Sequence, residues 1–450
     1  MIIKKQSIAI IGSGITGLSA SWLLHKKFDI TLFEKNNYLG GHTHTHDVTE
    51  GDHTLAIDSG FIVYNDKNYP NLIGLFKQLD VKTQDTDMSF AFSLNQGELE
   101  YAGTGLKGMF AQRGNIIRIK HWRLLQEIVR FNKTAHSELA RLEKEKSTEY
   151  SLGGFLKQHN FSVDLQKNYL LPMGAAIWSC PVETMYNFPA FSFLRFFANH
   201  GLIDLKNRPQ WRSVVGGSRE YINKMMPLLE PEISIEAGAE SVTRNSAGVE
   251  VTSAGKKSHF DQVIFACHAD EALKLLEQAS ASEEEILGCF GYQENNTYLH
   301  TDESLMPKRK NAWCSWNYLA QSVTSDNSTN AKNTIADKQV TATYWMNKLQ
   351  KINPQKNYFV TLNPYQQIDQ NKVIKTMTYH HPVFDRHAIN AQTRLNELQG
   401  KNNSWFCGSY AGYGFHEDGI ASSVDICKKL GVIAPWNADT DSAEKIGNSQ

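Results

Sequence analysis

The stretch SIAIIGSGITG, residues 7–17, is followed one helix length later by DITLFE, residues 29–34. Both stretches contain apolar runs that are typical of short parallel strands buried on both faces. Between them, apolar residues recur at helical spacing from Ile15 to Phe28. The order strand, glycine-rich turn, helix, strand and acid predicts a complete Rossmann βαβ unit, which is a stronger signal than G-x-G-x-x-G alone.

Each glycine of the turn has a physical role. Gly12 permits the tight turn out of the strand, Gly14 lets the backbone approach a pyrophosphate, and Gly17 lets the helix pack close to the sheet. The helix N-terminus, with Ser13 and Thr16, presents N–H groups and a partial positive charge to the phosphates. The turn therefore predicts dinucleotide binding.

The acid at the end of the second strand predicts the adenosine contact. Glu34 is placed to accept hydrogen bonds from ribose hydroxyls, and Lys35 follows it as a further predicted contact. These residues alone fit NAD as well as FAD. The choice depends on Gly40-Gly41-His42-Thr43, six residues further on.

This second glycine pair resembles flavoproteins of the monoamine oxidase and phytoene desaturase superfamily. The resemblance implies FAD as the cofactor and adds Gly41, His42 and Thr43 to its binding residues. A basic residue, usually arginine, follows the glycines in the superfamily and contacts the pyrophosphate. The chain has His42 there, which departs from the pattern.

Two later regions extend the resemblance. Residues Trp405 to Tyr410 are predicted to form a strand that ends in a turn. With a glycine-rich loop over residues 411–419 and a helix from Ile420 to Leu430, they match the closing strand–loop–helix of the superfamily. A predicted strand at Phe260–Cys267 matches one that returns to the FAD domain. By resemblance, the further cofactor-binding residues are Gly60, Val242 at the adenine, Gly408 near the pyrophosphate and ribityl chain, and Gly419 and Ile420 at the flavin pyrimidine.

Motifs along the chain to about residue 434 are similar to those of a bacterial group of FAD-dependent oxidoreductases. The motifs are DSGFIVYN at 58–65, YPN at 69–71, DMSF at 87–90, HHPVFD at 380–385 and GYGFHEDG at 412–419. Relatives of that group form the N-terminal part of plant cyclopropane fatty acid synthases. The resemblance implies a cyclopropane synthase-like methyltransferase as a partner and a lipid acyl chain as the substrate.

The expected fold is α/β, with a Rossmann-type FAD-binding domain and a discontinuous, amine oxidase-like α+β substrate domain. Residues 1–74, 208–290 and 400–436 are assigned to the FAD-binding domain, and 75–207 and 291–399 to the substrate domain. Residues 323–337 read as a surface loop, and 437–450 as a disordered tail.

Composition limits the possible partners and the cellular location of the protein. The formal net charge of −1 gives no global field for nucleic acid, so no nucleic-acid partner is expected. Six scattered cysteines without a C-x-x-C pair indicate reduced thiols in a cytoplasmic protein. The apolar run from Tyr169 to Trp178 is about half a membrane span, so the protein is expected to be soluble or at most peripheral to the inner membrane face.

Candidate catalytic residues cluster near the predicted flavin contact. His416 is a candidate proton donor or acceptor, with a structural histidine as the alternative, and Tyr410 and Tyr413 either line the flavin face or pack. The alternating histidines 42, 44 and 46 would share one strand face, but their place after the glycine pair favours a cofactor-lining loop over a metal site. No metal is therefore predicted.

The segment from Gln112 to Lys133 combines six cations with one acid, Glu127, and many apolar residues. It fits a basic amphipathic helix on anionic lipid, or a core-packed helix with a solvated basic face. Together with Phe193, Leu194, Phe196 and Phe197 it suggests an acyl tunnel.

The leading hypothesis is an FAD-dependent oxidoreductase that acts on an apolar substrate such as a lipid acyl chain. A flavin amine oxidase is the alternative that superfamily membership alone predicts, with Tyr410 and Tyr413 as its aromatic pair. The third hypothesis is a non-catalytic flavin-binding partner of a lipid-modifying enzyme.

Overall fold

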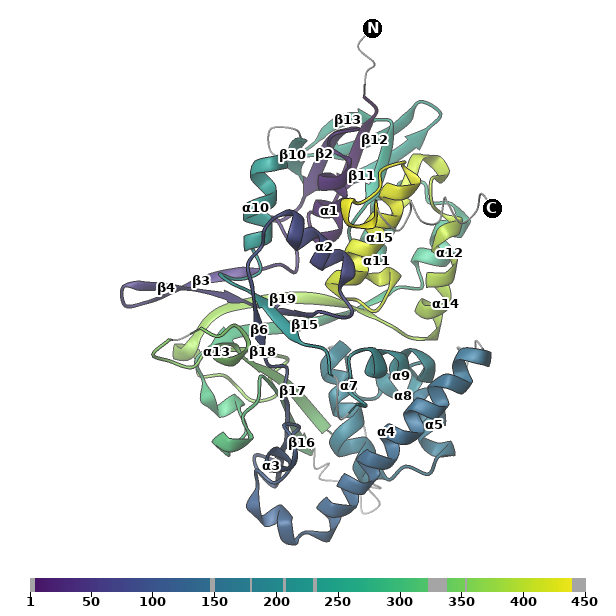
Figure 1. The fold of residues 1–450 in the computed structure, drawn as a ribbon. Coiled ribbons are helices and arrows are strands. Elements are labelled where there is room, and N and C mark those ends of the chain that lie inside the picture. The colour runs from purple at the N-terminus through teal and green to yellow at the C-terminus, as the bar shows by residue number, and fades with distance from the viewer. Residues whose placement is uncertain are drawn as a thin grey trace.

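The computed structural model describes residues 5–145, 150–178, 180–204, 208–229, 233–322, 338–352 and 354–438. The upper part of the molecule in Figure 1 is built on a parallel sheet, and the lower part on a larger mixed sheet with a group of helices. The loop predicted at 323–337 lies outside the described residues, as does the predicted tail except for residues 437 and 438.

The parallel sheet contains the predicted Rossmann unit. Its order is β10 (Ile233–Ala237), β2 (Asp29–Glu34), β1 (Ser7–Ile11), β14 (Gln262–Phe265) and β20 (Ser404–Phe406), and every neighbouring pair is parallel. Side chains of β1 alternate between two cores, with Ile8 and Ile10 on one face and Ala9 and Ile11 on the other. The apolar run in β1 therefore follows from burial on both faces.

Different elements pack on the two faces of the parallel sheet. On one face lie α1 (Ile15–Leu24), α2 (Pro70–Gln78), α10 (Glu220–Leu229) and α15 (His416–Lys429). On the other lie β11 (Ala239–Asn245), β12 (Gly248–Ser253) and β13 (Lys256–Phe260), with α11 (Ala269–Leu275), α12 (Ala281–Leu287) and α14 (Arg386–Arg394).

Two predicted boundaries were wrong. The strand predicted at Phe260–Cys267 is two strands, β13 and β14, in different sheets. Asp261 separates them, and its carboxylate accepts hydrogen bonds from the backbone N–H and the hydroxyl of Ser7. The last helix starts at His416, not Ile420, because Asp418 accepts a hydrogen bond from the Phe415 N–H and caps the helix start.

The lower sheet has seven strands. Its order is β19 (Val373–Val383), β15 (Gly291–His300), β18 (Phe359–Leu362), β17 (Lys338–Trp345), β16 (Trp316–Ser322), β7 (Phe90–Leu94) and β8 (Leu99–Ala102). Only the β16–β7 pair is parallel. A short helix, α13 (Met346–Leu349), follows β17.

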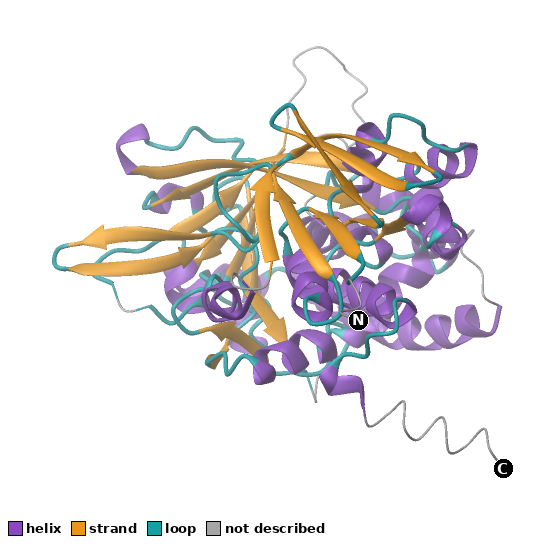
Figure 2. Ribbon diagram, turned by 90° about the horizontal axis from the view of Figure 1, so that it is seen from above, coloured by secondary structure: helices purple, strands orange, loops and turns teal. Residues whose placement is uncertain are grey.

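Smaller sheets connect the two parts. The hairpin of β3 (Thr45–Glu50) and β4 (His53–Asp58) projects to the left in Figures 1 and 2. Strand β9 (Trp211–Val214) pairs with β5 (Val63–Asn65) and β6 (Thr83–Thr86). Short 3-10 turns occur at Arg113–Ile117, Glu303–Leu305, Lys310–Ala312, Gln370–Lys372, Leu395–Glu397, Lys401–Asn403, Ser409–Ala411 and Pro435–Asn437.

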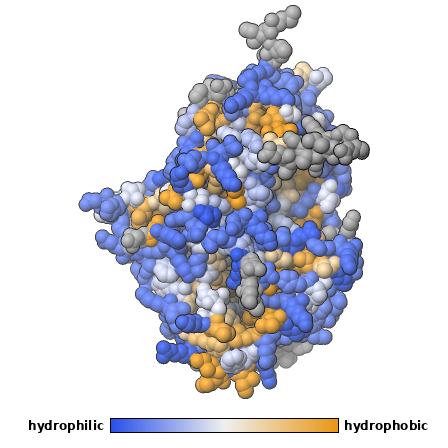
Figure 3. All heavy atoms as spheres, in the orientation of Figure 1, coloured by the Kyte–Doolittle hydropathy of each residue, from blue (hydrophilic) through white to orange (hydrophobic). Residues whose placement is uncertain are grey.

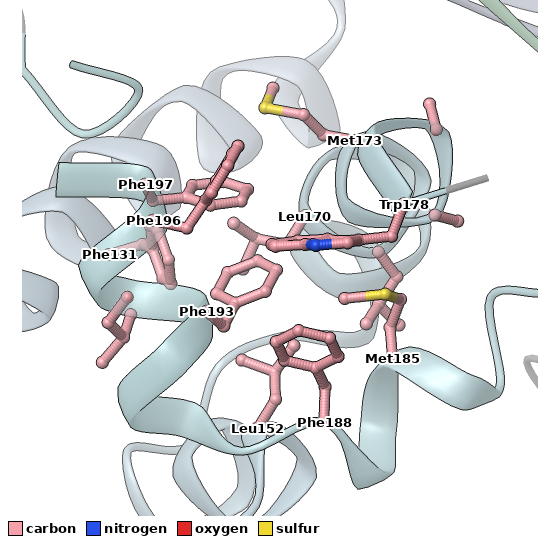
Figure 4. Close-up of a cluster of buried hydrophobic side chains, with 14 of the residues drawn as sticks. Phe131, Leu152, Leu170, Met173, Trp178, Met185, Phe188, Phe193, Phe196 and Phe197 are labelled. Carbon is pink, nitrogen blue, oxygen red and sulfur yellow. The ribbon is translucent and has the colours of Figure 1, made fainter. Parts of the chain in front are cut away.

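The helices of the lower part enclose an aromatic core. They are α3 (Leu106–Met109), α4 (Ile119–Glu145), α5 (Leu152–Gln158), α6 (Val163–Leu165), a π-helical turn (Gln166–Leu170), α7 (Leu171–Trp178), α8 (Thr184–Asn187) and α9 (Ala190–Asn199). Figure 4 shows Phe193, Phe196 and Phe197 pointing toward Trp178 and Phe188. The phenylalanines expected to line an acyl tunnel thus fill a packed core.

The two parts are assembled from separated stretches of chain. Strands of the parallel sheet lie at 7–34, 233–265 and 404–406, and those of the seven-stranded sheet at 90–102 and 291–383. We propose that these parts are the cofactor and substrate domains, with the boundaries predicted above. Among the described residues, no helix has the length and apolar character that a membrane crossing requires.

Candidate functional site

The turn between β1 and α1 places its three glycines in three different environments. Gly12 has φ +103°, and a Cβ there would lie 2.8 Å from the Ala266 carbonyl oxygen. A Cβ on Gly17 would lie 1.8 Å from the Gly12 carbonyl oxygen. A Cβ on Gly14 would meet no described atom within 4 Å. Packing therefore demands glycine at 12 and 17, whereas Gly14 faces open space.

Open space at Gly14 coincides with a helix start that can bind an anion. Gly14 is the N-cap of α1, and no side chain caps the first turn of this ten-residue helix. The first N–H groups of a helix have no partner within the helix, and the dipole makes that end positive. The residues present therefore fit the pyrophosphate of a dinucleotide at this position.

The predicted ribose contact lies beside the turn. The Glu34 carboxylate is buried, and accepts hydrogen bonds from the Ser13 N–H (3.0 Å) and the Asn36 N–H (2.8 Å). The Ser13 hydroxyl and the Asn36 side-chain amide also donate to Glu34, so a ribose hydroxyl would take the place of one of these two side-chain donors. The Lys35 side chain, by contrast, is largely exposed and forms an ion pair with Glu271.

Val242 lies in the three-stranded sheet on one side of the parallel sheet. Its side chain is buried in the same cluster as Ile11 and Phe33. Its carbonyl oxygen accepts a hydrogen bond from the Glu277 N–H at 3.2 Å. The structure thus brings Val242 to the far side of the sheet from α15.

The second glycine pair packs directly on the first turn. The Gly40 N–H donates to the Ser13 carbonyl oxygen at 3.0 Å, and a Cβ on Gly41 would lie 3.2 Å from the Gly14 Cα. A Cβ on Gly60 would lie 2.1 Å from the His42 carbonyl oxygen. Residues 12–17, 40–43 and 60 therefore form one continuous backbone surface.

The C-terminal helix completes this surface. A Cβ on Gly419 would lie 2.8 Å from Thr16 Oγ1, so α15 approaches the start of α1 closely. Ile420 is fully buried between these helices. The Gly408 N–H donates to Ser422 Oγ at 3.0 Å, which attaches the loop after β20 to α15. Four of the predicted cofactor-binding residues, Thr16, Gly408, Gly419 and Ile420, thus meet from opposite ends of the chain.

His416 links the C-terminal helix to the glycine pair. Its Nε2 lies 2.9 Å from Thr43 Oγ1, which also lies 2.6 Å from the Tyr221 hydroxyl. The ring stacks on Phe61 with centroids 3.8 Å apart. Burial lowers the pKa of His416 to about 3, so its imidazole is neutral at physiological pH.

The two candidate tyrosines lie in different surroundings. Tyr410 is buried beside Phe290, and burial raises the pKa of its hydroxyl well above the ordinary value. Tyr413 is half-buried and packs on the other core, near Phe196. Because they pack against separate clusters, their rings do not form an aromatic pair.

The structure brings three histidines together: His42 of the predicted cofactor site, His381 of the HHPVFD motif, and His268, which the sequence analysis did not single out. His42, from the glycine pair, lies 5.2 Å from His381 of β19 and 6.4 Å from His268, between ring centroids. Tyr379 lies 5.0 Å from His42. His268 lies three residues after the last residue of β14, and its position beyond the carboxyl end of a parallel strand is the local signal for it.

These imidazoles are held neutral. Burial, reinforced by His381 and His268, lowers the pKa of His42 well below its ordinary value. Burial also lowers the pKa of His381 to about 4. His381 Nδ1 lies 2.9 Å from Asn295 Nδ2, whereas the buried His42 Nε2 has no hydrogen-bond partner in the described structure. An orphaned buried nitrogen here fits a ligand that supplies the missing partner.

Of the alternating histidines after the glycine pair, His44 and His46 lie side by side, with ring centroids 4.1 Å apart. His44 Nδ1 lies 3.0 Å from the Tyr379 hydroxyl, and His46 Nε2 lies 2.8 Å from Ser59 Oγ. In the described part of the chain, no group of three or more His, Cys, Asp or Glu side chains is arranged to hold a metal ion.

Two acids beside His416 have structural partners. Glu417 accepts hydrogen bonds from the backbone N–H groups of Asn71 and Leu72 at the start of α2, and Asp418 accepts one from the Phe415 N–H. Burial raises the pKa of Asp418 to about 7. Capping of α2 by Glu417 joins residues 346 positions apart, so local sequence patterns contain no signal for it.

Comparison with known proteins agrees with this geometry. The family model for flavin containing amine oxidoreductases matches residues 15–351. A 45-residue stretch is 51% identical to tryptophan 2-monooxygenase of Allorhizobium ampelinum, and it covers 10% of this chain and 6% of that enzyme.

Solved structures share the fold over nearly the whole chain. A putrescine oxidase double mutant superposes with a TM-score of 0.67 at 14% identity, covering 95% of this chain and 99% of its own. Cyclohexylamine oxidase from Brevibacterium oxydans gives 0.63 at 12% identity, with 95% and 100% covered. A CLA-producing fatty acid isomerase from P. acnes gives 0.58 at 16%, with 96% and 100% covered.

The family match spans most of the chain. It begins within the glycine turn, at residue 15, and includes the glycine pair and His268. The predicted cofactor and fold class are confirmed. The chain belongs to the flavin containing amine oxidoreductase family and is an FAD-dependent oxidoreductase.

Proposed function

We propose that the protein oxidises or reduces an apolar substrate, a lipid acyl chain, by hydride transfer to or from FAD. Bound FAD supplies the redox chemistry, and the chain's own residues position the substrate and exclude water. The residues proposed to hold FAD are Gly12, Ser13, Gly14, Thr16, Gly17, Glu34, Lys35, Gly41, His42, Thr43, Gly60, Val242, Gly408, Gly419 and Ile420.

The observation that carries this proposal is an aromatic wall beside the loop before α15. Phe196 stacks on Phe415 with ring centroids 5.2 Å apart and on His200 at 3.8 Å, and it meets Tyr413 at 6.0 Å. This wall continues the packed core of the lower part up to the start of the helix that, by resemblance, faces the flavin. The half-buried Tyr413 and Phe415 present the accessible part of this wall, and an apolar substrate that covers them gains free energy in proportion to the area it buries.

Neutral polar groups near the wall also favour an uncharged substrate. Burial keeps His42, His381 and His416 neutral, and the nearby acids Glu417 and Asp418 bind backbone N–H groups. An amine oxidase must accommodate an ammonium group or its neutral form. Tyr410 and Tyr413 face separate cores, so they give no support to the amine alternative.

His416 is the strongest of the three candidate catalytic residues. Its ring is fixed by Thr43 and Phe61, and it can donate or accept a hydrogen bond as a neutral imidazole. The buried Tyr410 fits a packing role, and Tyr413 fits the substrate wall.

The shared fold and the family resemblance extend the proposal to the substrate, the partner protein and the site of action. A fatty acid isomerase shares this fold, so the architecture is compatible with an acyl substrate. A cyclopropane synthase-like methyltransferase acting on the same acyl chain is the proposed partner. The site of action would be the cytoplasmic membrane face, which the exposed apolar and basic side chains of residues 112–133 would contact.

Anaerobic mixing of the FAD-loaded protein with substrates tests the proposal. We expect phospholipid vesicles to bleach the visible flavin absorbance, or unsaturated phospholipid to reoxidise the photoreduced flavin. Putrescine and cyclohexylamine should do neither. Rapid bleaching by an amine, with no response to lipid in either direction, would overturn the proposal in favour of an amine oxidase.

A further inference from the structure

The lower end of the molecule exposes an apolar tip. We define the tip as residues 106–123, which comprise α3, the 3-10 turn Arg113–Ile117 and the first turn of α4. The side chain of Ile117 is 86% exposed and that of Leu106 is 74% exposed. The other exposed apolar side chains of the tip are Ile116, Ile119 and Trp122. Figure 3 shows this orange patch at the bottom of the molecule.

Cations surround the apolar side chains of the tip. The exposed basic residues are Lys107, Arg113, Arg118, Lys120 and Arg123. Residues 104–126 contain no Asp or Glu, although the whole chain carries slightly more acids than bases. The positive charge is therefore a local property of the tip, not of the protein.

Hydrogen bonds to the β7–β8 turn hold the tip in shape. The Asn115 side chain donates to the Glu100 carbonyl oxygen at 3.2 Å, and Arg118 donates to the Glu98 carbonyl oxygen at 2.9 Å. The Trp122 indole N–H donates to the Ile116 carbonyl oxygen at 2.8 Å. Polar groups thus form the framework, and apolar side chains are presented outward. A surface ordered in advance loses little conformational entropy on binding.

We propose that this tip docks the protein on the surface of an anionic lipid bilayer. Exposed isoleucine, leucine and tryptophan side chains would enter the headgroup and acyl boundary, and the basic ring would pair with anionic headgroups. A second copy of the chain is a poor occupant, because two tips would bring ten like charges together. A purely polyanionic partner would leave the apolar centre uncovered.

The tip is continuous with the core of the lower part. Leu124 and Phe131, on the next turns of α4, belong to the same aromatic cluster as Phe193 and Phe196. That cluster ends at Phe415, beside the candidate site. This inference rests on the proposed lipid function and narrows its membrane contact from residues 112–133 to the tip. The lipid source it names is the bilayer itself.

Vesicle sedimentation of the FAD-loaded protein tests the docking. We expect partitioning onto vesicles of phosphatidylcholine and phosphatidylglycerol in equal parts to exceed that onto pure phosphatidylcholine by about 10-fold, and to fall as salt rises from about 0.1 M to about 0.5 M. Equal partitioning onto both vesicle types would overturn the proposal.

Two double variants separate the apolar and ionic parts. Leu106→Ser with Ile117→Ser, and Lys107→Glu with Lys120→Glu, should each lower partitioning about 10-fold or more. These four side chains make no hydrogen bond to the framework among the interactions described above, so FAD content and thermal unfolding should stay as in the parent protein. Arg118 is left intact because it holds the tip.

Matched controls replace side chains of the same kind elsewhere. Leu228→Ser with Ile374→Ser removes exposed apolar side chains, and Lys26→Glu with Lys256→Glu reverses exposed charges. Both should bind vesicles like the parent. Tip variants that bind like the parent, or that convert a dimer to a monomer with no loss of vesicle binding, would overturn the proposal.

The outcome is separable from that of the proposed function. Tip-dependent vesicle binding without any flavin response to lipid would keep the docking surface and remove the acyl substrate. A flavin response to detergent-dispersed lipid without vesicle binding would do the reverse.

Discussion

The glycine turn and the histidine cluster both serve the candidate site, but they are built in opposite ways. The turn occupies six consecutive residues, 12–17, and works through backbone atoms at the start of α1. The cluster collects His42, His268 and His381 from three distant segments, and works through side chains kept neutral by burial. A site made by the backbone of consecutive residues can be recognised in the sequence as a motif. A site made by side chains from distant segments cannot.

Within the glycine turn itself, some glycines are required by packing and another by ligand binding. Gly12 and Gly17 have protein atoms where a Cβ would go, but Gly14 has none. Mutations at neighbouring glycines of one motif should therefore fail in different ways.

The largest expected effect is that of Gly17→Val. Its Cβ would lie 1.8 Å from the Gly12 carbonyl oxygen, so α1 must move away from the sheet. We expect a loss of about 3 kcal/mol or more in the free energy of unfolding, with little bound FAD. Urea titration and the visible spectrum of the purified protein measure the two effects.

Gly14→Ala is the matched control. Its Cβ meets no described protein atom, and Gly14 has φ −64°, which alanine adopts freely. The apoprotein should unfold within about 0.5 kcal/mol of the parent, while FAD affinity falls at least about 10-fold. Equal FAD affinity in Gly14→Ala and parent would show that the cofactor does not approach this backbone.

The histidine cluster should make stability depend on pH. Burial first, and then His268 and His380, lowers the pKa of His381 to about 4 in the folded protein, below the value of about 6.5 in the unfolded chain. As pH falls from about 6.5 to about 4, His381 binds a proton in the unfolded chain but stays neutral in the folded protein. The free energy of unfolding should therefore fall with pH in this window and stay level above it.

The variant His381→Gln isolates one member of the cluster. Its slope of unfolding free energy against pH should be smaller than that of the parent by about 1 kcal/mol per pH unit. Urea titrations across the window give both slopes, and the exposed His53→Gln serves as control. Identical slopes for His381→Gln and the parent would mean that His381 has the same pKa in the folded and unfolded states.

The smallest expected effect is at Lys35, the residue next to the ribose-binding acid. Its side chain is 65% exposed and pairs with Glu271, so we expect Lys35→Ala to change FAD affinity by less than about 3-fold. Glu34→Ala should weaken binding far more, because Glu34 is buried beside the turn. A strong loss in Lys35→Ala, measured by flavin titration, would restore Lys35 as a cofactor contact.

Much of the fold could be predicted from local patterns. Both strands of the βαβ unit, its helix and the closing β20–α15 pair follow from apolar spacing and glycine placement, which depend on near neighbours. The errors occurred where a distant partner decides the boundary. Asp261 ends a strand because it binds Ser7, 254 positions away.

The candidate site was only partly predictable for the same reason. The hydrogen bond from Gly40 to Ser13 and the close approach of Gly60 to His42 join residues less than about 30 positions apart. The positions of His268 and Asn295 relative to His42 and His381 are set only when β14, β15 and β19 are assembled. The phenylalanines of α9 show that local sequence can also suggest a feature that the structure does not have. Their composition suggested a tunnel, and packing made them a filled core.

The sequence by itself determined the dinucleotide turn, because glycine conformation, helix polarity and strand burial are local properties. Only the tertiary structure decided that Gly14 is the glycine with open space beside it and that three neutral histidines lie together. It also decided that the start of the basic segment is a hydrogen-bonded tip with its isoleucines exposed. Those features depend on which atoms surround a residue, and surroundings are set by segments hundreds of positions apart.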